Sequence, residues 1–228
     1  MKPQLLTRCT LFALLTLALL LVATTATAQN ATPAVPDLSD SQWAELHEGD
    51  LYVDVERDGS INRGIVIGIV QADISEVTPL IARCWEYADW RDNITDTSLE
   101  DQTDANHVVC GGTAKVPVIR NRRGHFDVYN RSETIDGTRA YVSNFDYVED
   151  SGNVEDMYGF WVAYPYGPDN EHTVVKHRLN VDIGSWVPNR LIRWATGRVL
   201  PDTIKGLRKE TVNGVDEPDY WRDGYDYD

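Results

Sequence analysis

The segment spanning residues 172–209 constrains the fold most, because it predicts a strand that leads directly into a long amphipathic helix. In residues 172–183, His177 and its apolar neighbours alternate with polar side chains, which is the two-residue period of a strand. Pro188 indicates the helix start, since proline is tolerated best in the first helical turn. An apolar stripe then recurs at helical spacing at Leu191, Ile192, Ala195, Val199, Thr203, Ile204 and Leu207. Such a helix must bury its stripe against a sheet, so this segment closes the fold.

The preceding residues predict a short helix, a hairpin, a second helix and a long meander. The short helix is expected after a cap at Ser39 or Ser41, and the second helix from a cap at Asp73 or Ser75 to about Trp90. The expected strands cover residues 51–56, 62–70, 95–100, 107–115, 125–134, 139–148, 157–164 and 172–183. Short turns connect most neighbours, which predicts antiparallel pairing.

A strongly bent sheet wrapped around the last helix would bury every apolar face of this pattern. The predicted fold class is therefore α+β, with a curved antiparallel sheet around a long C-terminal helix. Such a sheet encloses space between its concave surface and the helix. An apolar cavity with few polar groups is then the expected functional site.

The first residues have the features of a secretory signal peptide. Lys2 and Arg8 are followed by an apolar run over residues 11–23, which is too short to span a bilayer, and then by Ala26-Thr27-Ala28. Such a signal peptide would direct export of the chain to the periplasm or the outside of the cell, with cleavage near Ala28. The expected organisation is a signal peptide over residues 1–28, a linker over 29–40, one domain over 41–209 and an acidic disordered tail over 210–228.

The net charge and the hydropathy of the chain limit the classes of partner that it can bind. The chain has a net charge of −15, and loss of Lys2 and Arg8 with the signal peptide would make it −17. Nucleic acids and anionic membrane surfaces would be repelled by such a protein, so no nucleic-acid partner is expected. The sequence has no second long apolar stretch, so we expect no stable membrane anchor.

Cys84 and Cys110 remain after the expected cleavage, and two interpretations are open. In an oxidising compartment an isolated pair favours one disulfide, and the alternative is two buried free thiols. A metal site is not expected, because the sequence has no CxxC, HxxxH or HExxH spacing.

Two motifs in the closing segment resemble a known superfamily. The sequence VDIGSWVP at residues 181–188 is similar to the helix-start pattern D-x-G-G-x-(I/L)-P, with Ser185 in place of the second glycine. The sequence LPDTIKGLRK at residues 200–209 is similar to the pattern P-x-T-(I/L)-x-x-L-(R/K) near the helix end. Both patterns are typical of the START/polyketide-cyclase superfamily, and weaker similarity covers residues 68–90 and 116–122. The resemblance extends over residues 43–209.

The resemblance implies a helix-grip fold with a hydrophobic tunnel, a C-terminal helix that serves as its lid, and one lipid or other apolar molecule inside. It is also compatible with transient membrane contact. The superfamily includes both carriers and cyclases, so the resemblance by itself does not imply catalysis.

The candidate ligand-binding residues lie on the predicted inner faces. His177 could bind a ligand hydroxyl or act as a base, and the alternative is a core histidine satisfied by the backbone. Arg139 could contact a polar head group or lie in solvent at the sheet edge. Trp186 stands at the hinge between strand and helix. The full set is His177, Arg139, Tyr141, Phe145, Trp161, Trp186, Leu191, Ile192 and Ala195.

No nucleophile motif, glycine-rich phosphate loop or carboxylate pair stands out in the sequence, and no cofactor is expected. We therefore rank a carrier of one hydrophobic ligand, such as a lipid, sterol or isoprenoid, above an enzyme. The alternatives are a cyclase or aromatase that uses His177 as acid–base, and a domain whose acidic aromatic tail docks a protein.

Overall fold

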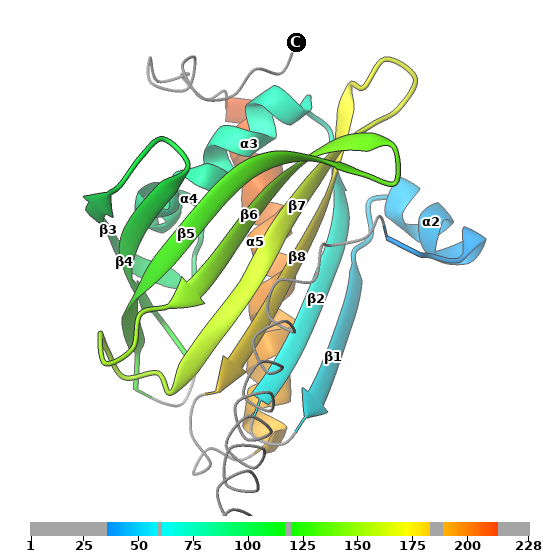
Figure 1. The fold of residues 1–228 in the computed structure, drawn as a ribbon. Coiled ribbons are helices and arrows are strands. Elements are labelled where there is room, and N and C mark those ends of the chain that lie inside the picture. The colour runs from blue at the N-terminus through cyan, green and yellow to red at the C-terminus, as the bar shows by residue number, and fades with distance from the viewer. Residues whose placement is uncertain (1–35, 59–60, 117–119, 183–188, 214–228) are drawn as a thin grey trace, which may run out of the picture. The chain divides into compact units, whose positions relative to one another are not determined.

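One antiparallel sheet of eight strands organises the part of the chain that the computed structural model describes, residues 36–58, 61–116, 120–182 and 189–213 (Figure 1). The strand order is β1-β2-β8-β7-β6-β5-β4-β3, and all neighbours are antiparallel. The strands are β1 (Tyr52–Asp58), β2 (Ile61–Val70), β3 (Ile94–Gln102), β4 (His107–Ala114), β5 (Arg122–Ile135), β6 (Thr138–Tyr147), β7 (Asp156–Tyr166) and β8 (His172–Asp182). This arrangement confirms the predicted meander and places the first hairpin beside the last strand.

The hairpin between β5 and β6 shows how local chemistry sets the register. Asp136 and Gly137 have φ values of 50° and 83°, the left-handed pair that a tight two-residue turn requires. The turn aligns Ile135 with Thr138 and then every following pair as far as Phe126 with Tyr147. This register decides which side chains face the helices.

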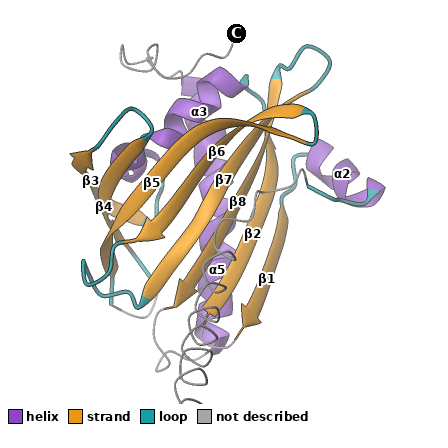
Figure 2. Ribbon diagram, viewed as in Figure 1, coloured by secondary structure: helices purple, strands orange, loops and turns teal. Residues whose placement is uncertain are grey.

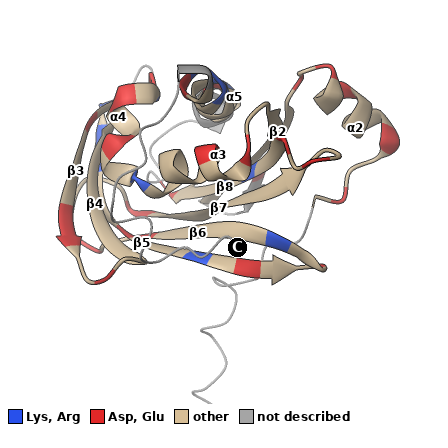
Figure 3. Ribbon diagram, turned by 90° about the horizontal axis from the view of Figure 1, so that it is seen from above, with Lys and Arg blue, Asp and Glu red and all other residues tan. Residues whose placement is uncertain are grey.

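The two longest helices cover the same face of the sheet, as Figures 2 and 3 show for α3 (Ile74–Ala82) and α5 (Asn189–Asn213). Strands β4 and β3 curl upward toward α4 (Tyr87–Trp90), so this face is concave. The largest core cluster lies here and includes Val66, Val77, Ile81, Tyr141, Trp161, Val175, Leu200, Ile204 and Leu207. The helix-grip arrangement expected from the sequence is confirmed.

A second apolar cluster lies on the opposite face, where α2 (Asp40–His47) packs. Ser39 caps α2 in a reciprocal arrangement with Gln42, which satisfies backbone groups at the helix start. Leu46 of α2 is buried with Ile67, Val142, Phe160, Val162 and Val174 of the sheet.

The predicted helix over residues 73–90 is interrupted. Helix α3 ends at Ala82, Arg83 adopts the non-helical angles φ −82° and ψ 66°, and a single 3₁₀ turn over Cys84–Glu86 leads into α4. The hydroxyl of Tyr87 donates to the carbonyl of Ile81 at 2.6 Å. This hydrogen bond ties α4 back to α3 across the break, a tertiary contact that helical periodicity does not encode.

Helix α5 ends at Asn213 and not at the expected boundary after Lys209. Thr211 is buried, and its hydroxyl donates to the carbonyl of Leu207 at 3.0 Å. The guanidinium of Arg208 also donates to the carbonyls of Ile69 and Gly49, each at 2.8 Å. The two Arg208 contacts fasten the last turns of α5 to β2 and to the turn before β1.

The surroundings of two glycines on α5 predict opposite effects of a Gly→Ala substitution on the free energy of unfolding. A Cβ at Gly206 would lie 2.7 Å from the carbonyl oxygen of Trp90 and 2.9 Å from its ring, whereas a Cβ at Gly197 would have no neighbour within 4 Å. We expect Gly206→Ala to lower the free energy of unfolding by about 1–3 kcal/mol through overpacking. The matched Gly197→Ala should raise it by about 0.5–1 kcal/mol through helix propensity. Chemical denaturation measures both, and a neutral Gly206→Ala would contradict the described packing of α5.

Candidate functional site

A cavity of about 210 Å³ lies between the concave face of the sheet, α4 and α5. The central strands β5 to β8 contribute mainly apolar side chains, because alternate residues of each strand point to this face. Examples from the strands are Ala114, Phe126, Phe145, Trp161 and Leu179, while α4 contributes Tyr87 and α5 contributes Val199 and Leu200. Leu200 belongs both to the core under α5 and to the cavity wall, so the cavity adjoins the core directly.

Three of the residues predicted from the sequence, His177, Phe145 and Trp161, line this cavity. Tyr141 is fully buried in the core beside it, where its hydroxyl donates to the Asn130 side chain at 2.8 Å. The structure therefore gives Tyr141 a packing role and a hydrogen bond outside the cavity wall.

Arg139 does not line the cavity. It is exposed at the start of β6, paired in register with Thr134 beside the hairpin turn. Arg139 is on the same face of β6 as the cavity residues Ser143 and Phe145, as predicted, but at this end of the strand β6 extends past the cavity. Of the two alternatives for Arg139, this position agrees with a side chain in solvent and not with a head-group contact in the cavity.

The remaining predicted residues cannot be placed at the wall. Trp186 lies outside the described residues. Leu191, Ile192 and Ala195 lie on α5, whose backbone is described there, but their side chains are not.

His177 is buried and held as a neutral imidazole. Its Nδ1 lies 3.2 Å from the carbonyl oxygen of Phe160, so Nδ1–H donates and Nε2 keeps its lone pair. The ring stacks on Trp161 at 3.9 Å between centroids. Burial, and secondly the charge of Arg91, lower the pKa of His177 to about 3. His177 is therefore a backbone-satisfied core histidine that also borders the cavity.

Arg91 is a cavity residue that the sequence analysis missed. It follows α4 directly, and its guanidinium carbon lies 5.2 Å from the ring centroid of Tyr87 and 5.9 Å from those of Trp90 and Trp161. Burial lowers the pKa of Arg91, and the neighbouring Tyr87 acts in the opposite direction. The sequence shows aromatic residues just before Arg91, but Trp161 arrives from β7, so only the fold completes this cluster.

A disulfide joins Cys84 and Cys110 in the cavity wall, with their Cα atoms 6.1 Å apart. This separation is within the range that disulfides accept. The bond links the 3₁₀ turn before α4 to β4, and so fixes the position of α4 over the curled edge of the sheet.

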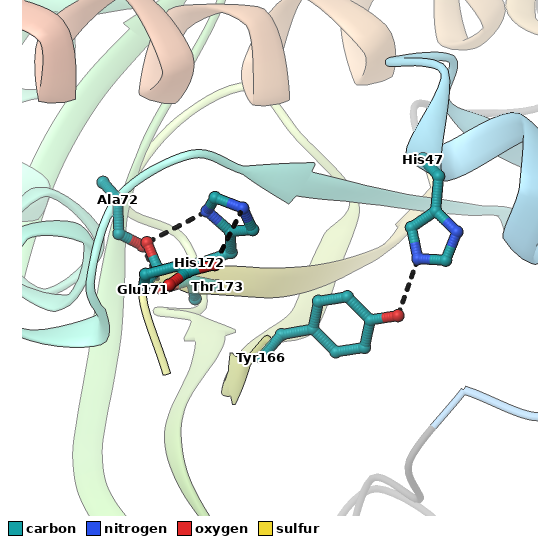
Figure 4. Close-up of polar contacts among 6 residues, drawn as sticks. All are labelled: His47, Ala72, Tyr166, Glu171, His172 and Thr173. Atoms are coloured by element: carbon teal, nitrogen blue, oxygen red, sulfur yellow. Dashed lines mark hydrogen bonds and ion pairs between the residues drawn. The ribbon is translucent and has the colours of Figure 1, made fainter. Parts of the chain in front are cut away.

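A second, shallow pocket lies around His47, Tyr166 and His172 on the surface (Figure 4). Nε2 of His47 lies 2.7 Å from the hydroxyl of Tyr166, and Trp43 stacks on the Tyr166 ring. These contacts fasten α2 to the end of β7. Among the described residues no group of His, Cys, Asp and Glu could hold a metal ion.

Comparisons with known proteins support the fold. No protein-family model and no curated protein matches the sequence. The STAR-related lipid transfer protein of Xanthomonas axonopodis matches in structure with a TM-score of 0.53 and 16% identity, over 70% of this chain and 91% of that one. Human StAR-related lipid transfer protein 5 matches with a TM-score of 0.54 and 16% identity, over 76% and 91%. The Zhui aromatase/cyclase from Streptomyces matches with a TM-score of 0.53 and 14% identity, over 67% and 94%.

The chain therefore shares the α+β helix-grip fold of these structures, as its sequence predicted. The matched structures include lipid transfer proteins and a cyclase, so the fold alone does not choose between these activities. No helix in the described ranges is long and apolar enough to cross a membrane.

The depressed pKa of His177 predicts a pH-dependent loss of stability. The unfolded chain binds a proton at this residue below about pH 6.5, whereas the native protein excludes it down to about pH 3. The contribution of His177 to the free energy of unfolding is therefore fully present above pH 6.5. Toward acid this contribution falls by up to about 1.4 kcal/mol per pH unit. In His177→Leu this part of the slope should disappear between neutral pH and about pH 5. If the free energy of unfolding changed with pH in the same way in the parent and in His177→Leu, then His177 would not be buried as described.

The disulfide predicts a second stability effect. Closing a loop with a sequence separation of 26 stabilises the native state by about 3.5 kcal/mol in the chain-entropy description. We expect the double variant Cys84→Ser/Cys110→Ser to lose a stability of this order in denaturant titrations. Intact mass after alkylation should show no free thiol at these positions in the exported protein. Two alkylated cysteines without reductant would contradict the bond.

Proposed function

We propose that the protein binds one hydrophobic ligand, of the lipid, sterol or isoprenoid type, in this cavity and carries it between sites. The observation that supports the proposal is the apolar wall formed by strands from the middle of the sheet, beneath a helix. An apolar molecule gains about 25 cal/mol for each Å² that leaves water, so such a wall supplies the binding energy. The lipid transfer proteins among the matched structures support this class of ligand.

A carrier is favoured over a cyclase by the state of His177. A general base works best when its pKa is near the working pH, and the pKa of His177 is lowered to about 3. Nε2 can still accept a hydrogen bond from a ligand hydroxyl, which suits recognition. Turnover that is lost in His177→Ala while ligand binding persists would favour the cyclase.

Access to the cavity is proposed to involve only the first part of α5. Leu200, Ile204 and Leu207 are fully buried, and Arg208 donates to the backbone carbonyls of Ile69 in β2 and of Gly49 in the turn before β1. We therefore propose that the half of the helix after Leu200 stays in place, and that only the part before it moves when the C-terminal helix acts as a lid. Gly197, which precedes this anchored half and makes no close contact, is a suitable pivot.

Export to the periplasm or the medium is proposed from the signal-like first residues. The disulfide between Cys84 and Cys110 supports the proposal, because such bonds persist in oxidising compartments. A soluble carrier in that location would shield its ligand from water between membranes.

Filling the cavity tests the proposed function. Ala114 lines the wall at the end of β4, so Ala114→Phe should place a ring in the space and weaken binding of the neutral apolar dye Nile red by roughly tenfold or more. Ala114→Ser is the matched control at the same position and should bind the dye almost as the parent does. Fluorescence titration gives both affinities. Circular dichroism checks that Ala114→Phe keeps its fold. If the folded variant binds Nile red as tightly as the parent does, the dye binds elsewhere and the cavity is not the binding site.

A further inference from the structure

The guanidinium of Arg91 borders an apolar cavity without an acidic partner. Among the described residues no carboxylate lies within ion-pair distance of it, and its one described hydrogen bond runs from Nη2 to Thr203 Oγ1 at 3.2 Å. Its Nε is buried and has no hydrogen-bond partner. Three aromatic rings, those of Tyr87, Trp90 and Trp161, have their centroids within 6 Å of its guanidinium carbon.

The neighbouring Asn93 adds a second unsatisfied group. It also lines the cavity, and its Oδ1 is buried without a hydrogen-bond partner. Buried polar atoms are normally paired, so two such atoms from residues two positions apart indicate that something else completes the site. Because both residues line the same cavity, a molecule bound there can reach them.

The charges around the cavity favour an anion. None of the described wall residues is Asp or Glu, whereas Lys115, Arg122 and Arg123 line the cavity together with Arg91. The whole chain has a net charge of −15, so this local excess of positive charge runs against its composition.

An unpaired buried cation is costly, and cation–π contacts offset only part of that cost. Removing an ion from water costs several kcal/mol even after the protein relaxes, while a cation–π contact contributes about 0.5–2 kcal/mol. A carboxylate that binds the planar guanidinium through two parallel N–H···O bonds offsets the cost better than any neutral group does.

We propose that Arg91 is the counter-ion of the ligand, and that the ligand is a single-chain amphiphile with a carboxylate head group. The inference rests on the proposed function, and it names the class of ligand. The head group pairs with Arg91 deep in the wall, and the chain lies along Phe126, Phe145 and Leu179. A cavity of about 210 Å³ suits one chain, since it is smaller than the roughly 300–1,000 Å³ of typical small-molecule pockets.

Matched ligands test the proposal on the full-length mature protein. Isothermal titration with dodecanoate and dodecanol compares two chains of equal length that differ in the head group. The parent protein should bind dodecanoate at least roughly tenfold more tightly at neutral pH. Arg91→Met should remove this preference by weakening dodecanoate and leaving dodecanol unchanged, and Arg91→Lys should keep part of it.

Two further variants separate Arg91 from a general effect of charge. Arg123→Met removes another cation of the wall and should reduce the preference less than Arg91→Met does, while Lys205→Met, on the exposed side of α5 and outside the wall, should not change it. Arg91→Met should be at least as stable as the parent without ligand, because it removes a half-buried charge that has no acidic partner among the described residues. Arg91→Lys decides the matter if Arg91→Met does not fold.

Three results overturn the inference. The first is equal affinity of the parent for dodecanoate and dodecanol, and the second is a preference that survives in Arg91→Met. The third is a preference that Arg123→Met reduces as much as Arg91→Met does. Nile red binding distinguishes the two levels of the account: if the dye binds and dodecanoate is not preferred, only the carboxylate inference fails. If neither the dye nor either ligand binds, the proposed function fails as well.

Discussion

The close packing of the last turns of α5 on the concave face of the sheet is the contact on which the rest of the structure depends. Gly68 of β2 and Gly206 of α5 allow it, because a side chain at either position would collide with a neighbour: Leu51 and Ile204 at Gly68, and Trp90 at Gly206. Leu200 and Leu207 are buried in this contact. With the helix held at this end, the sheet curls around it toward α4, and the cavity forms between the curled strands and α5 at Val199 and Leu200.

Much of this arrangement could be predicted from the sequence, because it depends on local patterns. Alternation gave the strands to within a few residues, and Asp136-Gly137 fixed the β5–β6 hairpin. The apolar stripe from Val199 to Leu207 identified the buried face of the closing helix. Parity along β8 correctly placed His177 toward the helices, where it lines the cavity. The fold was predictable since each of these signals is carried by residues close together in the chain.

The site was predicted less well, because its polar part is assembled from distant segments. Arg91 lies between Tyr87 of α4 and Trp161 of β7, and nothing near Arg91 in the sequence reveals the second ring. Arg139 shows the converse error: its parity is inward, but the strand continues beyond the cavity there, and periodicity gives no information about where a cavity ends. The break at Arg83 was hidden for the same reason, since a tertiary hydrogen bond and a disulfide hold it.

Arg91 and His177 also explain how an apolar site can be selective. The charge of Arg91 helps to keep His177 neutral, so the wall presents a fixed cation and an uncharged acceptor side by side with aromatic rings. Such groups orient a ligand, whereas the apolar wall supplies most of the binding energy. Native mass spectrometry of the mature protein, purified from its own source without added lipid, tests the central claim most directly. The account predicts one noncovalent ligand per chain that denaturation releases and organic solvent extracts. A ligand-free mass, together with no uptake of Nile red, would contradict it.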